Sequence, residues 1–273
     1  MCRHLAYAGP PASLRSLLVD PPHSLYRQAW APRRQRHGTV NADGFGVGWY
    51  AAGDPVPARY RQAGPVWADL SLPDLARVTR SGTVLAAVRS ATPGTAAGAE
   101  AAAPFGCGPW LFSHNGVVPG WREWADPALV PSLEALVDSA LLWALALRRL
   151  RAGAAMDAAL AGTIADAEAA SPAGRYNLLL TDGRSIAATA CGDTLWYRRS
   201  PEAVTVASEP DDDGPGWTEV PDRHLLTAAA GQVRVRPLAG RPHEPSRAPT
   251  PGPPPGRAPD TGSDLSTEGI FTS

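Results

Sequence analysis

Two consecutive helical segments, with predicted strands both before and after them, constrain the fold of this chain more than any other feature. Leu133–Leu150 and Met156–Ala169 are expected to be helices, and Ser132 stands where the N-cap of the first is expected. The predicted strands are Cys2–Gly9, Gly44–Tyr50, Thr83–Arg89, Trp110–His114, Tyr176–Thr181, Ser185–Cys191, Leu195–Arg199, Ala203–Ser208 and Gln232–Pro237. This order favours a layered α+β domain over a doubly wound sheet.

A change of composition marks the end of the predicted domain. With 273 residues, 44% of them hydrophobic, the chain can bury a sizeable core. Beyond about Leu238, prolines recur among Gly, Ser and Arg, and this composition cannot build a core. We expect a folded domain over residues 2–238 and a disordered Pro-rich tail over 239–273. A short recognition motif within Pro251–Pro259 is the alternative for the tail.

Charge and cysteine content exclude several classes of function. The formal net charge is −1, so no overall field draws the chain to nucleic acid or to an anionic membrane. The three cysteines lack the paired spacings of zinc or iron–sulfur sites, and their odd number argues against a disulfide framework. Without a signal-peptide pattern or an uncharged apolar span, we expect a cytoplasmic protein. All of its basic residues are Arg, which indicates GC-rich bacterial coding, and the oligomeric state stays open.

Cys2 directly follows Met1. Methionine aminopeptidases remove the first methionine when residue 2 is small, so we expect a mature chain that begins with Cys2. Such a residue carries both a thiol, which needs a base to act as a nucleophile, and an α-amine with an ordinary pKa of about 7.7–8.0. The amine can accept the thiol proton near neutral pH. Cys2 is therefore a candidate nucleophile, although a cysteine also occurs at this position by chance.

The segment His114-Asn115-Gly116 could stabilise the oxyanion that forms when a nucleophile attacks an amide. The side-chain amide of Asn115 and the backbone N–H of Gly116 would make a pocket with two donors where a strand ends. Asn115-Gly116 is an equally good type I′ hairpin turn, and that alternative stays open.

Two charged residues could bind the opposite charges of an amino-acid substrate. Arg89 follows an apolar strand, from which its guanidinium could clamp a carboxylate, and Thr92 could add a hydroxyl. The alternative for Arg89 is a surface salt bridge. Asp138 is surrounded by leucines in its predicted helix, so its carboxylate needs a cationic or donor partner. That partner could be a ligand ammonium, a capping amide or an arginine elsewhere in the fold.

Together these motifs resemble the class II (N-terminal cysteine) glutamine amidotransferases, which have the four-layer αββα sandwich of the Ntn hydrolases. The motifs occur in that family's order: Met1-Cys2, Arg89-Ser90-Ala91-Thr92, His114-Asn115-Gly116 and Asp138-Ser139. The resemblance implies that Cys2 is the nucleophile, its amine the general base, and Asn115 with Gly116 the oxyanion hole. It implies that the substrate-binding residues are Arg89, Thr92, His114 and Asp138.

Finer features resemble the stand-alone γ-glutamyl hydrolases of ergothioneine biosynthesis, which remove glutamate from γ-glutamyl-hercynylcysteine sulfoxide. They are Met1-Cys2-Arg3-His4-Leu5, the block Asn41–Tyr50, and Ala207-Ser208-Glu209-Pro210 with Asp211–Asp213 and Trp217. The chain has no room for the synthase domain that most family members carry, so the resemblance favours hydrolysis through a Cys2 thioester. This chemistry uses a small γ-glutamyl substrate and needs no metal or organic cofactor. One departure is Pro93, where many relatives in the broader family carry His.

Two alternative functions stay open. The chain could be a glutaminase subunit that passes ammonia to a separate synthase. It could also be a ligand-binding or scaffold protein on an inactivated Ntn fold.

A betaine substrate carries a permanent trimethylammonium group, which aromatic faces attract by about 0.5–2 kcal/mol each. Trp49, Tyr50 and Trp110 lie beside proposed site segments and are candidates for this contact, with a packing role as the alternative. Asp43 and the run Asp211–Asp213 could also attract the cation, and the alternative for the run is a solvated loop.

Overall fold

The computed structural model describes residues 2–92, 94–229 and 231–239. The chain divides into one unit, Met1–Arg241, and a second, Pro242–Ser273. Apart from Ala239, the predicted tail 239–273 lies outside the described residues. No helix among the described residues is long and apolar enough to cross a membrane.

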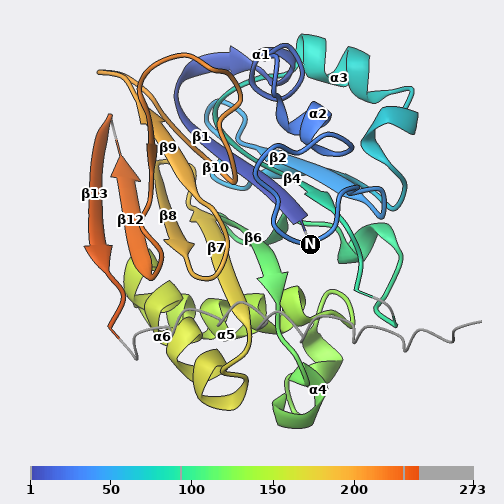
Figure 1. Ribbon diagram of the computed structural model, residues 1–273, viewed down its shortest axis with the longest axis vertical. Helices are drawn as coiled ribbons and strands as arrows, with labels where there is room; N and C mark the ends of the chain where they lie inside the picture. Colours follow the sequence, from blue (N-terminus) through green and yellow to red (C-terminus); the bar gives the residue numbers. More distant parts are fainter. Residues whose placement is uncertain (1, 93, 230, 240–273) are drawn as a thin grey trace, which may run out of the picture. The chain divides into compact units, whose positions relative to one another are not determined.

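Two antiparallel sheets form the centre of the first unit (Figure 1). The larger has the strand order β11-β9-β10-β1-β4-β2-β3 and the smaller β13-β12-β8-β7-β6-β5. The larger sheet contains β1 (Cys2–Ser13), β2 (Phe45–Trp49), β3 (Ala58–Gln62), β4 (Arg80–Arg89), β9 (Trp196–Arg199), β10 (Val204–Ala207) and β11 (Trp217–Glu219). The smaller contains β5 (Phe105–Cys107), β6 (Trp110–Val117), β7 (Arg175–Thr181), β8 (Ser185–Ala190), β12 (His224–Ala229) and β13 (Gln232–Pro237).

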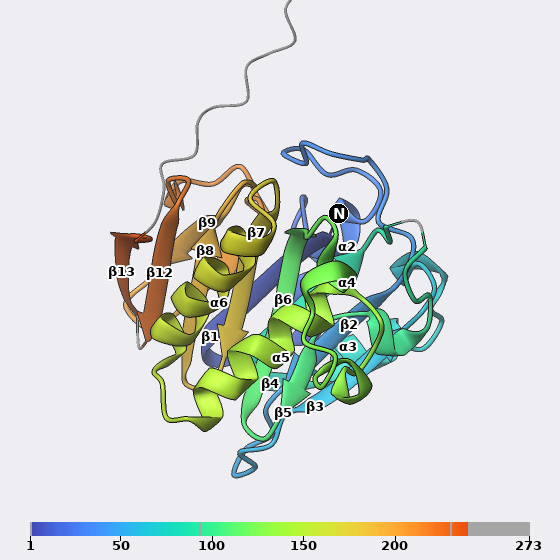
Figure 2. The same cartoon turned by 90° about the horizontal axis from the view of Figure 1, so that it is seen from below.

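Helices cover the outer face of each sheet, as Figure 2 shows for the smaller one. The short helices α1 (Leu14–Leu18), α2 (Leu25–Gln28) and α3 (Leu72–Val78) lie on the larger sheet, and α4 (Trp121–Trp124), α5 (Asp138–Arg151) and α6 (Met156–Ala170) on the smaller. In β1, Leu5 packs toward the helices, whereas Ala6 packs into the core between the sheets. Both faces of the strand are therefore buried. The predicted four-layer αββα arrangement is confirmed.

The predicted helix Leu133–Leu150 is too long at its N-terminal end. The helix begins at Asp138, its N-cap is Val137, and Ser132 ends a 3-10 turn instead of capping it. The carboxylate of Glu134 accepts hydrogen bonds from both Arg59 and Arg61, 3.0 and 3.1 Å away. These contacts hold the segment before Asp138 against β3, so it does not join the helix.

All nine predicted strands are present, and several are longer than predicted. The strand predicted at Trp110–His114 continues to Val117, because Gly116 pairs with Tyr176 and Val117 with Arg175 of β7. The hairpin-turn alternative for Asn115-Gly116 is therefore wrong. Four strands were not predicted: β3, β5, β11 and β12.

The Gly-rich strand β2 shows why glycine is needed where elements approach closely. A Cβ on Gly46 would overlap the carbonyl oxygen of Ala103 and the side chain of Arg61. This confirms the prediction that the Gly-rich segment admits a close backbone.

Candidate active site

Cys2 lies at the start of β1, where the larger sheet contacts β6 of the smaller sheet. It is the first residue of β1 and lies opposite Arg89 of β4. Its backbone nitrogen donates a hydrogen bond to Oδ1 of Asn115 on β6, 3.1 Å away. Its side chain is only partly buried, so a ligand can reach the thiol. The structure thus brings three predicted site residues together from three separate segments.

The side-chain nitrogen of Asn115 has no hydrogen-bond partner in the described chain. The residue is completely buried, and its Oδ1 accepts the hydrogen bond from Cys2. Its Nδ2 is buried and has no partner among the described residues. Buried polar groups are almost always paired, so a lone donor beside a partly exposed thiol marks a place for a ligand oxygen.

Gly116 follows Asn115 within β6, opposite Tyr176. A Cβ at this position would overlap the carbonyl oxygen of Arg175 and the ring of His114. Only glycine fits there without a shift of backbone. The prediction of a turn at this position was wrong, but the expected absence of a bulky side chain beside Asn115 is confirmed.

His114 is buried, and both of its ring nitrogens have partners. Nε2 lies 2.9 Å from the carbonyl oxygen of Arg175, which can only accept, so Nε2 carries the proton. Nδ1 then accepts a hydrogen bond from the hydroxyl of Ser139, 3.0 Å away. Burial lowers the pKa of His114, which keeps the ring neutral. The ring therefore ties β6 to the start of α5.

Asp138 is the first residue of α5, where the helix dipole favours a negative charge. Its Oδ2 accepts the backbone N–H of Val118 at 2.9 Å, and its Oδ1 accepts that of Ser139 at 2.8 Å. Backbone amides are thus its partners, as the capping-amide alternative held, and no arginine of the described chain forms an ion pair with it, so the alternative of an arginine partner is wrong. The residue is partly exposed.

Arg89 is 7% exposed and lies at the end of β4. Its guanidinium donates to the carbonyl oxygens of Asp43 and Ala96 and to the hydroxyl of Thr95, at 3.2, 2.8 and 3.1 Å. These bonds use three of its five N–H donors, so two remain. Within the described ranges it has no carboxylate partner, and the alternative of a surface salt bridge is wrong.

Thr92 is exposed on the loop that Arg89 holds in place. Its carbonyl oxygen accepts the N–H and the hydroxyl of Thr95, at 3.1 and 2.7 Å. The same hydroxyl accepts the hydrogen bond from Arg89. Pro93, the departure from the broader family, lies outside the described residues.

The aromatic side chains predicted to contact a cation have packing or positioning roles, whereas Asp43 lies beside Arg89, whose guanidinium donates to its carbonyl oxygen. Trp49 lies opposite Val84, five residues before Arg89 on β4, which is about 16 Å along a strand. Tyr50 donates its hydroxyl hydrogen to the carbonyl oxygen of Pro109, and Trp110 packs on the core under α5. Asp43 accepts the N–H of Ala91 at 2.8 Å. The three aromatic side chains therefore have packing or positioning roles, as their alternative held. Asp43 positions the backbone of Ala91.

The acidic run Asp211–Asp213 is not a freely solvated loop. Asp211 and Asp212 form ion pairs with Arg198, at 3.4 and 2.6 Å. Asp213 pairs with Arg33 and with His23, at 2.6 and 3.0 Å.

One part of the site was not predicted from the sequence. Arg3 is completely buried, and its Nε donates to the carbonyl oxygen of Cys2 at 2.9 Å. Its Nη1 lies 4.0 Å from Glu209, while both terminal nitrogens lack a hydrogen-bond partner among the described residues. The carboxylate of Glu209 accepts the backbone N–H groups of Arg33 and Arg34, at 2.9 and 2.6 Å. The signals available in the sequence were an Arg directly after Cys2 and a Glu directly after the predicted strand Ala203–Ser208.

Known proteins share both the sequence and the fold. Residues 20–214 match the family model of the class II glutamine amidotransferases. The chain is 44% identical over 241 residues to the gamma-glutamyl-hercynylcysteine sulfoxide hydrolase of Mycolicibacterium smegmatis, covering 87% of this chain and all of that protein. The protein of that name from Mycobacterium tuberculosis is also 44% identical, over 87% of this chain and 97% of its own length.

A solved structure agrees with these sequence matches. The glutamine aminotransferase class-II domain protein from Silicibacter pomeroyi is 28% identical, with a TM-score of 0.63 over 88% of this chain and 100% of that one. Arg89, Asn115 and Asp138 fall within residues 20–214 of the family model, and Cys2 precedes them. The chain belongs to the class II glutamine amidotransferases.

Proposed function

We propose that this chain is a γ-glutamyl amidohydrolase that cleaves γ-glutamyl-hercynylcysteine sulfoxide into hercynylcysteine sulfoxide and glutamate. The unpaired Nδ2 of buried Asn115, beside Cys2, is the observation that carries the reaction type. The substrate is supported by 44% identity to hydrolases named for it, over the full length of one of them.

The reaction begins once Met1 has been removed. The free amine of Cys2 accepts the thiol proton, and Sγ attacks the γ-carbonyl carbon of the substrate. The carbonyl oxygen becomes an oxyanion, which accepts hydrogen bonds from Nδ2 of Asn115 and the N–H of Gly116. Oδ1 of Asn115 holds the Cys2 nitrogen at 3.1 Å, so one side chain positions the base and stabilises the charge.

The glutamyl group is held by groups of opposite charge. Arg89 binds the α-carboxylate with its two remaining N–H donors, because no carboxylate of the described chain neutralises it. Asp138 binds the α-ammonium with its partly exposed carboxylate. Thr92 adds its hydroxyl. His114, which has both ring nitrogens occupied, positions Asp138 through Ser139.

The proton balance closes on Cys2 itself. The tetrahedral intermediate collapses, the C–N bond breaks, and the leaving amine takes the proton that the Cys2 amine had accepted. The Cys2 amine then takes a proton from the water molecule that attacks the thioester. It returns this proton to Sγ as the thioester breaks, which releases glutamate and restores the thiol. We further propose that the enzyme works in the reducing cytoplasm, where the three unpaired cysteines stay reduced.

The test is to follow free glutamate from a γ-glutamyl conjugate with wild-type protein, Cys2→Ala and Cys107→Ala. Cys107 is also a partly buried free cysteine, so it is the matched control. We expect activity in the wild type and in Cys107→Ala and none in Cys2→Ala. Intact mass should show loss of Met1. Activity in Cys2→Ala refutes the mechanism, and glutamine as the preferred substrate favours the ammonia-donor alternative.

A further inference from the structure

A cavity of about 200 Å³ is lined by Glu209, which lies 4.0 Å from Arg3. Its walls include Arg34 from the loop after α2, Trp196 at the start of β9, Glu209, and Trp217 at the start of β11. At about 30 Å³ per water, the volume has room for a group the size of an amino acid. Asp212 and Asp213, from the acidic run considered for the substrate's cation, also line the cavity, whereas the residues predicted to cleave or bind the glutamyl group do not.

The cavity lies on the flank of β1 opposite the proposed glutamyl site. Cys2 faces Arg89 of β4 on one side of the strand. On the other side β1 pairs with β10, and the backbone N–H of Ser208 donates to the carbonyl oxygen of His4. Glu209, the next residue, is therefore level with the start of β1. An amide cleaved at Cys2 has its acyl half toward Arg89 and can place its amine half toward this cavity.

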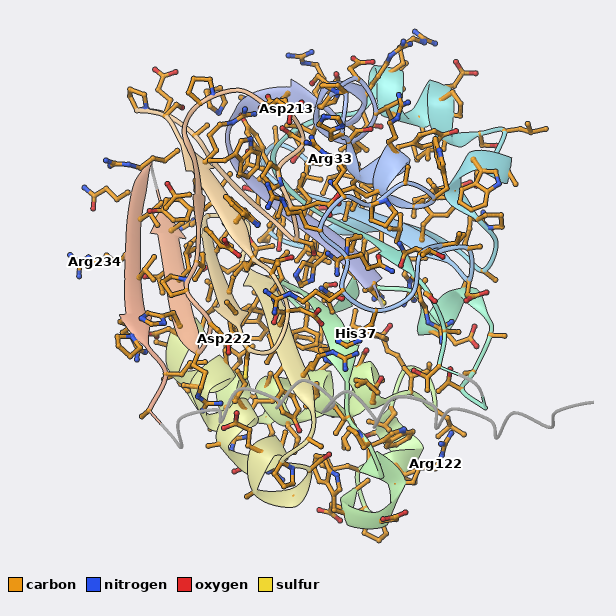
Figure 3. All side chains as sticks on the ribbon, in the orientation of Figure 1. Arg33, His37, Arg122, Asp213, Asp222 and Arg234 are labelled. Carbon is orange, nitrogen blue, oxygen red and sulfur yellow. The ribbon has the colours of Figure 1, made fainter. Side chains whose placement is uncertain are left out.

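Most charges in the cavity wall are already paired. Asp213 binds Arg33 and Asp212 binds Arg198, both at 2.6 Å. Figure 3 shows Arg33 and Asp213 close to one another. Glu209 accepts two backbone N–H groups. Asp212 and Asp213 thus have arginine partners, and Glu209 lies 4.0 Å from Arg3.

Two donors in the wall remain uncommitted within the described part of the chain. The guanidinium of Arg34 lies 5.1 Å from the ring centre of Trp196, and only its backbone N–H is used, in the bond to Glu209. Nε1 of Trp196 is buried without a partner. A free guanidinium, held by an aromatic ring and next to an unpaired N–H, fits a carboxylate. Arg198 lies 4.8 Å from the ring centre of Trp217, so each of the two rings already carries an arginine on one face, and only the second faces could add a surface for a flat or cationic group.

We propose that this cavity is the subsite for the amine half of the substrate, and that Arg34 and Trp196 select amines carrying a carboxylate. This inference rests on the proposed hydrolase function and adds to it the residues that recognise the leaving group. Its ligand class is an amino acid with a flat or cationic side group. Arg34 and Trp196 are specificity-determining residues and take no part in bond cleavage.

The test compares two substrates that share the glutamyl half. One is γ-glutamyl-hercynylcysteine sulfoxide, and the other is γ-glutamyl-p-nitroanilide, whose leaving group has no carboxylate. For Arg34→Ala we expect kcat/KM to fall about tenfold or more on the first substrate, the loss expected for a charge-assisted bond, with little change on the second. Trp196→Phe keeps a ring but removes the N–H, and we expect a smaller loss on the first substrate only.

The control variant is Arg234→Ala, because Arg234 is exposed on the edge strand β13, far from Arg33 in Figure 3. It should behave as wild type with both substrates. A second measurement is the calorimetric Kd of hercynylcysteine sulfoxide, which should rise about tenfold in Arg34→Ala.

The outcomes separate the two proposals. If wild type hydrolyses neither substrate, the proposed function fails, while the Kd of the amine still tests the cavity. If wild type hydrolyses both and Arg34→Ala changes neither, or lowers both equally, the subsite assignment is overturned. An unchanged Kd in Arg34→Ala overturns it as well.

Discussion

The backbone nitrogen of Cys2 donates a hydrogen bond to Oδ1 of Asn115, 3.1 Å away and 113 positions later in the sequence. This bond fixes the orientation of the amide, because Oδ1 is occupied and Nδ2 must point elsewhere. Nδ2 is buried without a partner among the described residues. The fold therefore holds an unpaired donor beside Cys2, the proposed nucleophile, before any substrate binds.

Replacing Asn115 should separate its two roles. Asn115→Ala loses both the acceptor for the Cys2 nitrogen and the donor for the oxyanion, and we expect kcat to fall by about 10²–10³. Asn115→Asp keeps an acceptor but replaces the donor by oxygen. If the donor stabilises the oxyanion, both variants lose activity to a similar degree. Substantial kcat in Asn115→Asp would contradict the donor role; circular dichroism checks the fold.

Arg89→Lys should weaken recognition of the α-carboxylate. Lysine keeps the charge but loses the planar fork, and it cannot also hold the Thr95–Ala96 segment with the bonds that Arg89 makes. We expect KM for the γ-glutamyl substrate to rise about tenfold, as for loss of one charge-assisted bond. The control is a substrate without the α-carboxylate, for which wild type and variant should differ much less. Equal loss with both substrates would mean that Arg89 acts only on the loop.

Gly116→Ala should destabilise the protein, because the added Cβ overlaps the carbonyl oxygen of Arg175. We expect the free energy of unfolding to fall by about 1–3 kcal/mol, the usual cost of overpacking. Gly64→Ala is the matched control, since a Cβ on Gly64 meets no atom within 4 Å. Urea unfolding of both variants measures the difference. Equal stability of the two variants would show that β6 can shift at no cost.

Features read from local sequence were predicted well. The strand that carries Arg89 has both faces buried, so its continuous apolar run is unambiguous. Cys2, Arg89 and Asn115 were each proposed as site residues from their chemistry and their order in the sequence. What the sequence could not show is that Asn115-Gly116 stays in a strand, because that depends on pairing with β7, some 60 positions later.

The parts that were missed depend on long-range contacts. The start of α5 at Asp138 is set by Glu134, which is bound by arginines of β3. The pairing of Arg3 with Glu209 joins opposite ends of the domain. An isolated Arg or Glu in a sequence is expected to be solvated. Only the fold shows that these two are buried.

The pH dependence of stability should carry the signature of His4. This residue is fully buried, and burial, followed by the charge of Arg3, lowers its pKa to about 3. In the unfolded chain its pKa is about 6.5. Between these values the unfolded chain binds a proton that the folded protein does not. The stability that comes from keeping His4 neutral is therefore fully present above about pH 6.5. The free energy of unfolding falls by about 1.4 kcal/mol per pH unit as the pH drops toward 3.

His4→Gln removes this proton while keeping a polar group near Ser113, which lies 3.2 Å from Nδ1 of His4. We expect the free energy of unfolding to depend less steeply on pH between about 4 and 6.5. The slope should be smaller by the contribution of one proton, about 1.4 kcal/mol per pH unit. His37→Gln is the control, because His37 is exposed. Urea unfolding at several pH values gives the slopes. If His4→Gln keeps the wild-type slope, His4 does not stay neutral in the folded protein.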